Sequence, residues 1–467
     1  MRTVSLQEIA QHNKKDDLWV IIHGKVYDLT KFLPEHPGGQ KVVLKFAGKD
    51  GTKTFDRFHP ADIIQRYLSP DVCIGEAEVN NSGEQEPEVE TEEDKRVRLA
   101  REKMPRLDEM YNTFDFESVA RNILKADSWA YFNGGANDEI SMRENHNAFH
   151  RIWLRPRVMV DVSKIDMTTT MLGDKASMPL YISATALGKM AHPDGEKALA
   201  VAAGKRGVIQ MIPTLASCSI DEIVGARVHA DQTQWFQLYV HKDRRREKDL
   251  RQKYVHEGPN EFQDEEINRE GGAATAMSGI IDNTLNWNDL AWFKSITKLP
   301  IVLKGIQTKE DAVLAARYGC AGIVISNHGG RQLDFAPSPI EILPEIMSAL
   351  KQEKLENIME IYIDGGIRRG SDIFKALALG AKGVGIGRPT LYAMSGYGAK
   401  GVQRLLELYQ NELEMCMRLM GTPTLADIKP EMVDIRNLKD HFVANPTDYL
   451  ANLSYEKMVP RGNLSKL

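Results

Sequence analysis

Short apolar runs recur along the chain from about residue 98 to its end, and helical patterns separate most of them. Each run ends in small or polar residues, as parallel barrel strands do where they meet a site. This alternation predicts an α/β (TIM) barrel, a parallel sheet closed on itself and surrounded by helices. We count seven candidate strands, one fewer than a complete barrel needs; they are 180–184, 208–212, 235–240, 301–304, 322–326, 360–364 and 383–387.

A histidine and an arginine follow the fifth of these runs, in the segment Ser-Asn-His-Gly-Gly-Arg. His328 is thereby expected just past the C-terminal end of a strand, where barrel enzymes keep their chemistry. Arg331 offers a planar guanidinium that matches a carboxylate. A base next to a carboxylate clamp suits proton removal from a substrate that carries an acid group. The structural alternative is a His–Arg pair that merely caps the strand.

Glycine-rich loops follow the last two runs. Such loops, placed after the last two strands of a barrel, commonly seat a phosphate through backbone N–H groups and a guanidinium. Two ordinary strand-to-helix turns are the alternative, and they are less plausible for the pair than for either loop alone. The residues concerned are Asp364, Gly365, Gly366, Arg368, Gly387 and Arg388.

Residues 1–78 form a separate unit by their pattern. Two short apolar runs, 19–22 and 25–29, predict strands, and two histidines follow them, His36 in His-Pro-Gly-Gly and His59 in Phe-His-Pro. Two histidines on loops at the ends of short helices can hold one metal from opposite faces. Two surface histidines are common, however, and His12 and His23 compete as candidates.

Composition limits the remaining possibilities. The net charge of −5 and the pI of about 6.2 give no support for nucleic-acid binding. Four cysteines without metal spacing indicate free thiols. No apolar run approaches the ~18 residues of a membrane span, so no membrane insertion is expected.

Three further features divide the chain. The stretch 79–97 is acidic and has almost no apolar residues, which predicts a mobile linker. The barrel then spans 98–440, and 441–467 form a tail. The tail ends in Ser465-Lys466-Leu467, which matches the peroxisomal address, so we expect a peroxisomal protein. We see no mitochondrial presequence or signal peptide before the first unit.

The His328 segment and the glycine-rich loops resemble those of the FMN-dependent 2-hydroxy acid dehydrogenases and oxidases. The His-Pro-Gly-Gly unit with its second histidine resembles the cytochrome-b5-type domain, an α+β fold. Together they resemble the haem-carrying, L-lactate-oxidising members of that family. The resemblance implies FMN and haem b as cofactors, a small 2-hydroxy acid as substrate, a cytochrome c-like electron acceptor and a homotetramer.

The same resemblance assigns roles to individual residues. It makes His36 and His59 the axial haem ligands, and it makes His328 the base. Arg331 and Tyr131 then hold the substrate carboxylate, and Tyr239 contacts the substrate hydroxyl. The remaining residues are assigned to FMN: Ala184, Thr185, Ala186, Gln237, Lys304, Ser326, Asp364, Gly365, Gly366, Arg368, Gly387 and Arg388.

One segment departs from the family pattern. The family has a fourth strand ending in Thr-Val-Asp-Ala-Pro, but no β-like apolar run lies between Val240 and Ile301 here. The lost piece carries the aspartate that bonds the catalytic histidine, and it removes the scaffold of Arg246, which matches a second active-site arginine. We interpret the loss as a mis-assembled gene model or an alternative splice, with a seven-stranded inactive barrel as the alternative.

Two other functions therefore stay open beside lactate dehydrogenation. A peroxisomal 2-hydroxy acid oxidase that uses oxygen is favoured by the tail and disfavoured by the haem unit. A haem electron carrier with an inactive barrel is favoured by the missing strand.

Overall fold

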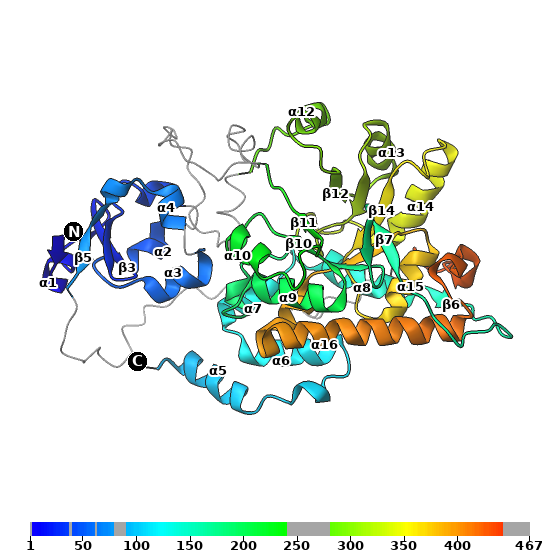
Figure 1. Cartoon of the computed structure of the whole chain (residues 1–467), viewed down its shortest axis with the longest axis horizontal. Helices are drawn as coiled ribbons and strands as arrows, with labels where there is room; N and C mark the ends of the chain where they lie inside the picture. The colour runs from blue at the N-terminus through cyan, green and yellow to red at the C-terminus, as the bar shows by residue number, and fades with distance from the viewer. Residues whose placement is uncertain (1, 37–39, 61–62, 79–89, 241–280, 442–467) are drawn as a thin grey trace, which may run out of the picture.

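The computed structural model describes residues 2–36, 40–60, 63–78, 90–240 and 281–441, which form an N-terminal unit and a larger barrel unit (Figure 1). The N-terminal unit is built on a five-stranded sheet in the order β1-β5-β4-β3-β2. Its strands are β1 (Arg2–Val4), β2 (Asn13–Lys14), β3 (Asp17–Ile22), β4 (Lys25–Asp28) and β5 (Cys73–Ala77). Its helices are α1 (Leu6–Ile9), η1 (Leu33–Glu35), α2 (Gln40–Leu44), α3 (Thr52–Phe58), α4 (Ile63–Tyr67) and η2 (Pro70–Val72).

Alternation along β3 explains why this small sheet is covered on both faces. Leu18, Val20 and Ile22 point into one apolar cluster, whereas Ile21 points into another that includes Val26 of β4. Successive side chains of a strand face opposite sides, so a single strand supplies both cores.

The barrel unit contains seven parallel strands in the order β11-β10-β9-β15-β14-β13-β12. The last strand pairs with the first, since Gly385 of β15 lies opposite Tyr181 of β9. The strands are β9 (Leu180–Ile182), β10 (Ile209–Ile212), β11 (Gln234–Phe236), β12 (Val302–Ile306), β13 (Gly322–Ile325), β14 (Glu360–Asp364) and β15 (Gly383–Ile386). All seven correspond to strands that the sequence predicts.

Helices cover the outside of this sheet. The long α16 runs beneath the barrel in the orientation of Figure 1 and packs on α6, α9 and α15. The helices are α5 (Glu92–Glu102), η3 (Leu107–Glu109), α6 (Thr113–Ile123), α7 (Ala126–Asn133), α8 (Ile140–His150), η4 (Gly188–Met190), α9 (Glu196–Arg206), α10 (Ile220–Gly225), α12 (Asp289–Ile296), α13 (Lys309–Arg317), α14 (Pro339–Gln352), α15 (Gly370–Ala378), α16 (Arg388–Met420), η6 (Leu425–Asp427) and η7 (Pro430–Met432). The accessory strands are β6 (Trp153–Leu154), β7 (Thr169–Met171), β8 (Asp174–Ala176) and β16 (Val433–Asp434).

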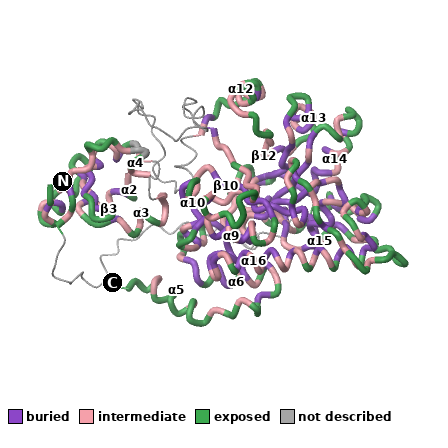
Figure 2. The backbone as a smooth tube through the Cα atoms, in the orientation of Figure 1, coloured by how far each residue is buried: buried purple, intermediate pink, exposed green. Residues whose placement is uncertain are grey.

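The barrel interior is filled by side chains rather than open. Tyr181, Trp235 and Tyr362 come from three different strands and meet there with ring centroids 5.1–5.8 Å apart. Their strand neighbours point outward into the main core against the helices, which appears as the buried region of Figure 2. A closed interior of this kind leaves the C-terminal ends of the strands as the place for a site.

In the described part of the barrel, the backbone hydrogen bonds between strands do not close the sheet into a full ring. β11 and β12 stand at the two ends of the strand order and do not pair with each other. The N–H of Asp282 donates to the carbonyl of Val240 at 2.8 Å, so the chain returns beside the point at which it left β11. Residues 241–280, including Arg246, lie outside the described residues. The prediction of seven strands is therefore confirmed for the described part of the chain.

The linker expected over 79–97 differs in its second part. Helix α5 begins at Glu92, after Thr91 accepts a hydrogen bond from the N–H of Asp94. Three acidic residues in its first turn favour a helix start, because they complement the positive end of the helix dipole. Positions 79–89 and the tail from 442 lie outside the described residues.

Candidate active site

Three polar side chains from neighbouring strands meet at the C-terminal end of the barrel. Lys304 Nζ lies 3.0 Å from Ser326 Oγ and 3.2 Å from the carboxylate of Asp364. Ser326 Oγ in turn donates to Asp364. A register shift between Lys304 and Ile306, where β12 pairs with β13, redirects the strand at this point. The structure thus brings these three predicted residues together.

His328 contacts this network through its backbone. Its backbone N–H donates to Ser326 Oγ at 3.0 Å, and its φ of 56° marks the sharp turn that the loop makes after β13. The positive charge of Lys304, followed by burial, lowers the pKa of His328 to about 3, while Asp364 acts in the opposite direction. The imidazole is therefore neutral at physiological pH, the form in which it accepts a proton.

A pair of amides fixes the His328 loop. Asn145 of α8 and Asn327 exchange two side-chain hydrogen bonds, each 2.7 Å long, in a buried position. Asn327 also accepts from the backbone N–H of Gly330 at 3.0 Å. We did not assign these asparagines a role from the sequence, although Asn327 stands next to His328. No local signal marks Asn145.

Arg331 reaches the aromatic wall of the site. Its guanidinium donates to the carbonyls of Tyr131 and Gly134 at 2.7 and 2.9 Å, and its central carbon lies 5.2 Å from the centroid of the Tyr131 ring. Burial raises the pKa of both Tyr131 and Tyr239, and the charge of Arg331 opposes that rise in each. Both hydroxyls thus stay protonated near Arg331 and can donate a hydrogen bond.

The two remaining arginines gather beside the glycine-rich loops. Arg388 donates to the carbonyls of Phe132, Gly329 and Gly134, and burial together with Arg331 and Arg368 lowers its pKa to about 10. Arg368 is paired with Glu117 at 2.6 Å. This region holds more positive than negative side chains, so an anionic group would be stabilised there.

The glycines of these loops are needed for different reasons. A Cβ at Gly366 would lie 1.8 Å from the carbonyl oxygen of Asn145, so packing of α8 requires that glycine. At Gly387 a Cβ would meet only the Thr185 methyl, at 3.7 Å. Gly365 has a φ of 97°, and a Cβ added there would press on the side-chain amide of Asn145. Only Gly387 therefore leaves room that a ligand could use.

The space beside Gly387 fits a flavin nucleotide. Thr185 Oγ1 is buried there without a hydrogen-bond partner, which is costly unless a ligand supplies one. Ala184 and Ala186 flank it with small side chains. Gln237 directly follows β11, and its amide oxygen accepts a hydrogen bond from the N–H of Thr214 at 3.3 Å. Together with the surplus of cations, these features suit a flat ring that carries a phosphate.

His36 and His59 face each other in the N-terminal unit with ring centroids 6.0 Å apart. A metal bonded at about 2 Å to one nitrogen of each ring holds the centroids about 6 Å apart. His59 Nδ1 donates to the carbonyl of Phe55 at 3.1 Å, which leaves Nε2 for a metal, and burial lowers the pKa of His59 and keeps it neutral. These rings fit the two axial positions of a haem. Positions 37–39 of the His-Pro-Gly-Gly motif lie outside the described residues.

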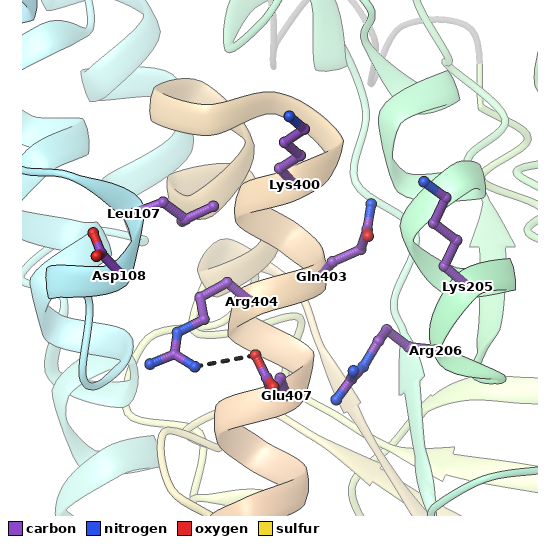
Figure 3. A pocket seen from close by; sticks show the side chains of 8 residues that line it. All are labelled: Leu107, Asp108, Lys205, Arg206, Lys400, Gln403, Arg404 and Glu407. Atoms are coloured by element: carbon purple, nitrogen blue, oxygen red, sulfur yellow. Dashed lines mark hydrogen bonds and ion pairs between the residues drawn. The ribbon is translucent and has the colours of Figure 1, made fainter.

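A cleft elsewhere on the barrel unit shares no residue with these sites (Figure 3). It has a volume of about 850 Å³ and lies between α9, α16 and η3. Its lining is mostly charged, and Arg404 is paired with Glu407 within it at 3.0 Å. Charged walls of this kind are typical of a solvated groove rather than of a flavin site. Within the described residues, no helix has both the length and the apolar character needed to cross a bilayer.

Comparison with known families agrees with this geometry. The FMN-dependent dehydrogenase family matches residues 120–262 and 251–435, and the cytochrome b5-like haem/steroid-binding domain matches residues 5–78. The L-lactate dehydrogenase (cytochrome) of Wickerhamomyces anomalus is 47% identical, over 96% of this chain and 83% of that protein. Glycolate oxidase 3 of Arabidopsis thaliana is 39% identical over 68% of this chain and 95% of its own length.

Solved structures show the same relationship. The recombinant flavin-binding domain of baker's yeast flavocytochrome b2 is 44% identical and has a TM-score of 0.70, over 79% of this chain and 98% of that one. A mandelate oxidase variant with (S)-mandelic acid is 31% identical, with a TM-score of 0.59, over 70% of this chain and 98% of its own.

The relatives also bear on the missing strand. The alignment with the Wickerhamomyces protein spans 478 positions, whereas 96% of this chain is about 448 residues. About 30 aligned positions therefore have no counterpart in this chain.

Proposed function

The chain belongs to the FMN-dependent dehydrogenase family, and on that premise we propose that it oxidises L-lactate, or a 2-hydroxy acid of similar size, to the 2-oxo acid. The observation that carries the proposal is a neutral His328 held above Lys304 and beside Arg331. A base, a carboxylate clamp and a cation for a reduced cofactor then lie in one place. The Wickerhamomyces relative, named for this activity, matches both units of the chain.

Each side chain has a role in this proposal. Arg331 and Tyr131 bind the substrate carboxylate, and Tyr239 orients the hydroxyl. His328 accepts a proton from the substrate and holds it at a ring nitrogen. Asp364, the described acid that favours protonated His328, then stabilises the cation. Ala186 leaves room for a short side chain such as the methyl group of lactate.

Two groups hold the cofactors in the proposal. In the proposal, FMN would be held by Lys304, Ser326, Asp364, Gln237, Arg368, Arg388, Gly365, Gly366 and Gly387, and Ala184, Thr185 and Ala186 would line the same site. FMN supplies the acceptor for the two electrons that leave the substrate. His36 and His59 would hold haem b, which would supply one-electron transfer to and from the acceptor.

An absorbance spectrum tests the proposal. The purified chain should show both flavin and b-type haem bands. Adding L-lactate under anaerobic conditions should bleach the flavin band and sharpen the haem bands of the reduced iron. A chain that binds both cofactors but does not respond to lactate, glycolate or another short 2-hydroxy acid would contradict the proposal.

Two other functions make different predictions. The oxidase alternative is favoured by the match to glycolate oxidases, and it predicts oxygen uptake that does not depend on cytochrome c. The inactive-barrel alternative is favoured by β11 and β12, which stand as edge strands in the described part of the sheet. It predicts a protein that contains haem and little FMN, so the ratio of the two cofactors distinguishes it.

We propose three finer properties, each with its own test. The acceptor is a cytochrome c-like protein, which a cytochrome c reduction assay tests. Four copies assemble, which light scattering tests. The tripeptide Ser465-Lys466-Leu467, outside the described residues, directs import into peroxisomes. A reporter ending in residues 462–467 should enter peroxisomes, and the same reporter without the last leucine should not.

A further inference from the structure

Three consecutive residues at the end of α3 connect the two units. Arg57 donates to Ser128 Oγ at 3.0 Å and lies 3.6 Å from the carboxylate of Asp127. Phe58 packs against the main core of the barrel unit. The carbonyl of His59 accepts from Lys189 Nζ at 3.4 Å. In Figure 1 this end of α3 lies next to the barrel unit.

The barrel residues in this contact belong to elements that also carry the candidate flavin site. Asp127 and Ser128 lie on α7, the helix that presents Tyr131. Lys189 lies on η4, directly after the segment that contains Thr185 and Ala186. The end of α3, which carries the candidate haem ligand His59, therefore contacts two elements that line the candidate flavin site, α7 and η4.

The position of Lys189 is held by a buried carboxylate. Glu196 is fully buried and accepts from the N–H groups of Gly188 and Ser217 at 2.8 and 3.0 Å. The backbone N–H of Lys189 donates to Ser217 Oγ at 2.8 Å, and that hydroxyl donates to Glu196 at 2.8 Å. Because the backbone is already fixed in this way, the contact with His59 has to order only the lysine side chain and not the backbone as well.

We propose that Arg57 and Lys189 are the positioning residues that dock the haem unit onto the flavin barrel for electron transfer, a proposal that rests on the function above. In each transfer one electron leaves reduced FMN and one ferric haem becomes ferrous, so one substrate molecule supplies two transfers. In the Arg57–Asp127 pair the carboxylate is exposed and the guanidinium half-buried, so solvent ions reach the pair and docking should weaken as ionic strength rises.

Charge reversal on the full-length protein, loaded with both cofactors, tests this proposal. Arg57→Asp should place two acids opposite each other, and Asp127→Arg in the same chain should restore the pair. Lys189→Ala removes the second contact without touching the first. Lys125→Ala is the control, because Lys125 precedes α7 and pairs with Asp94 of α5 at 2.7 Å.

Rapid mixing with L-lactate separates the two steps. Flavin reduction should stay within about twofold of the parent rate, whereas haem reduction should be about fivefold slower in Arg57→Asp and in Lys189→Ala. The charge-swapped double variant and the control should match the parent. Unchanged haem reduction in both Arg57→Asp and Lys189→Ala would overturn the proposal.

Small-angle scattering gives a readout that does not depend on turnover. At low ionic strength the radius of gyration should increase in Arg57→Asp and return to the parent value in the double variant. If lactate fails to reduce the flavin of the parent, the proposed function fails, but scattering still tests docking. Equal radii for parent and Arg57→Asp would overturn the docking role.

Discussion

Lys304 on β12 and Asp364 on β14 form an ion pair of 3.2 Å across the intervening strand β13. The strand between them ends next to His328, so the imidazole lies under opposing influences from the two charges. Lys304 is the larger influence, because the pKa of His328 is lowered to about 3. The pair therefore sets the protonation state of the candidate base.

The pH dependence of flavin reduction should reveal this influence. Neutral His328 is the working form, so the rate is lost as pH falls through its pKa and is regained as pH rises. In the parent the loss should lie well below pH 5, whereas Lys304→Met should raise the pKa toward the ordinary ~6.5 and bring the loss into the range of pH 5–7. Single-turnover flavin reduction, measured from pH 5 to 8 on flavin-loaded protein, checks this.

Lys309→Met is the matched control, since Lys309 pairs with Glu345 on the protein surface at 3.4 Å. An acid limb that stays in place, or moves to lower pH, in Lys304→Met would refute the electrostatic account.

Replacing the candidate base should affect the chemical step. His328→Gln retains a polar side chain but removes the proton acceptor, so flavin reduction by lactate should slow by ~10²–10⁴-fold with little change in lactate binding. Single-turnover rates and the dependence on lactate concentration measure the two effects separately. His229→Gln, at an exposed position, should behave as the parent. The assignment fails if His328→Gln reduces flavin at the parent rate.

Arg331→Lys should weaken substrate binding as well as slow the reaction. A lysine keeps the charge but cannot form the two parallel hydrogen bonds of a guanidinium to a carboxylate. We expect the dissociation constant of lactate to rise about tenfold or more. Arg317→Lys, on a surface ion pair with Glu353, provides the control. Unaltered lactate affinity in Arg331→Lys would show that the clamp lies elsewhere.

The haem ligands can be tested by spectrum in the full-length chain. His36→Ala or His59→Ala should abolish the low-spin b-type spectrum, because either change removes one axial ligand. His23→Ala is the control, since His23 is exposed and bonds Asp56 at 2.8 Å instead. Normal haem content with an unchanged spectrum in both ligand variants would contradict the assignment.

The sequence predicts the strands well and the long-range contacts poorly. Apolar runs locate all seven barrel strands, because a strand buried on both faces has a purely local signature. The hydrogen bonds between Asn145 and Asn327 join positions 182 residues apart, and Arg331 bonds a carbonyl 200 residues away. Such contacts depend on how the sheet closes, which no local pattern records. The motifs therefore indicate which residues form the site but not which side chains hold them.

The unpaired edges of the barrel lead to the last prediction. β11 and β12 are terminal in the described sheet, and unpaired parallel edges both expose backbone hydrogen-bonding groups and misplace the loops around the site. Among the described groups, Asp364 is the acid that raises the pKa of His328. Its carboxylate is already paired with Lys304. Within the described residues, protonated His328 therefore has no acid that is dedicated to it alone.

We expect the chain as written to be less soluble, and to reduce its flavin more slowly, than a version with about thirty residues restored after Asp243. A charge-assisted contact from the restored aspartate should stabilise protonated His328 by ~1.5–3 kcal/mol, or about ten- to a hundredfold in its protonation equilibrium. Sequencing the transcript checks for the segment directly, and parallel expression compares the two chains. Equal solubility, FMN content and lactate oxidation in both would show that seven strands suffice.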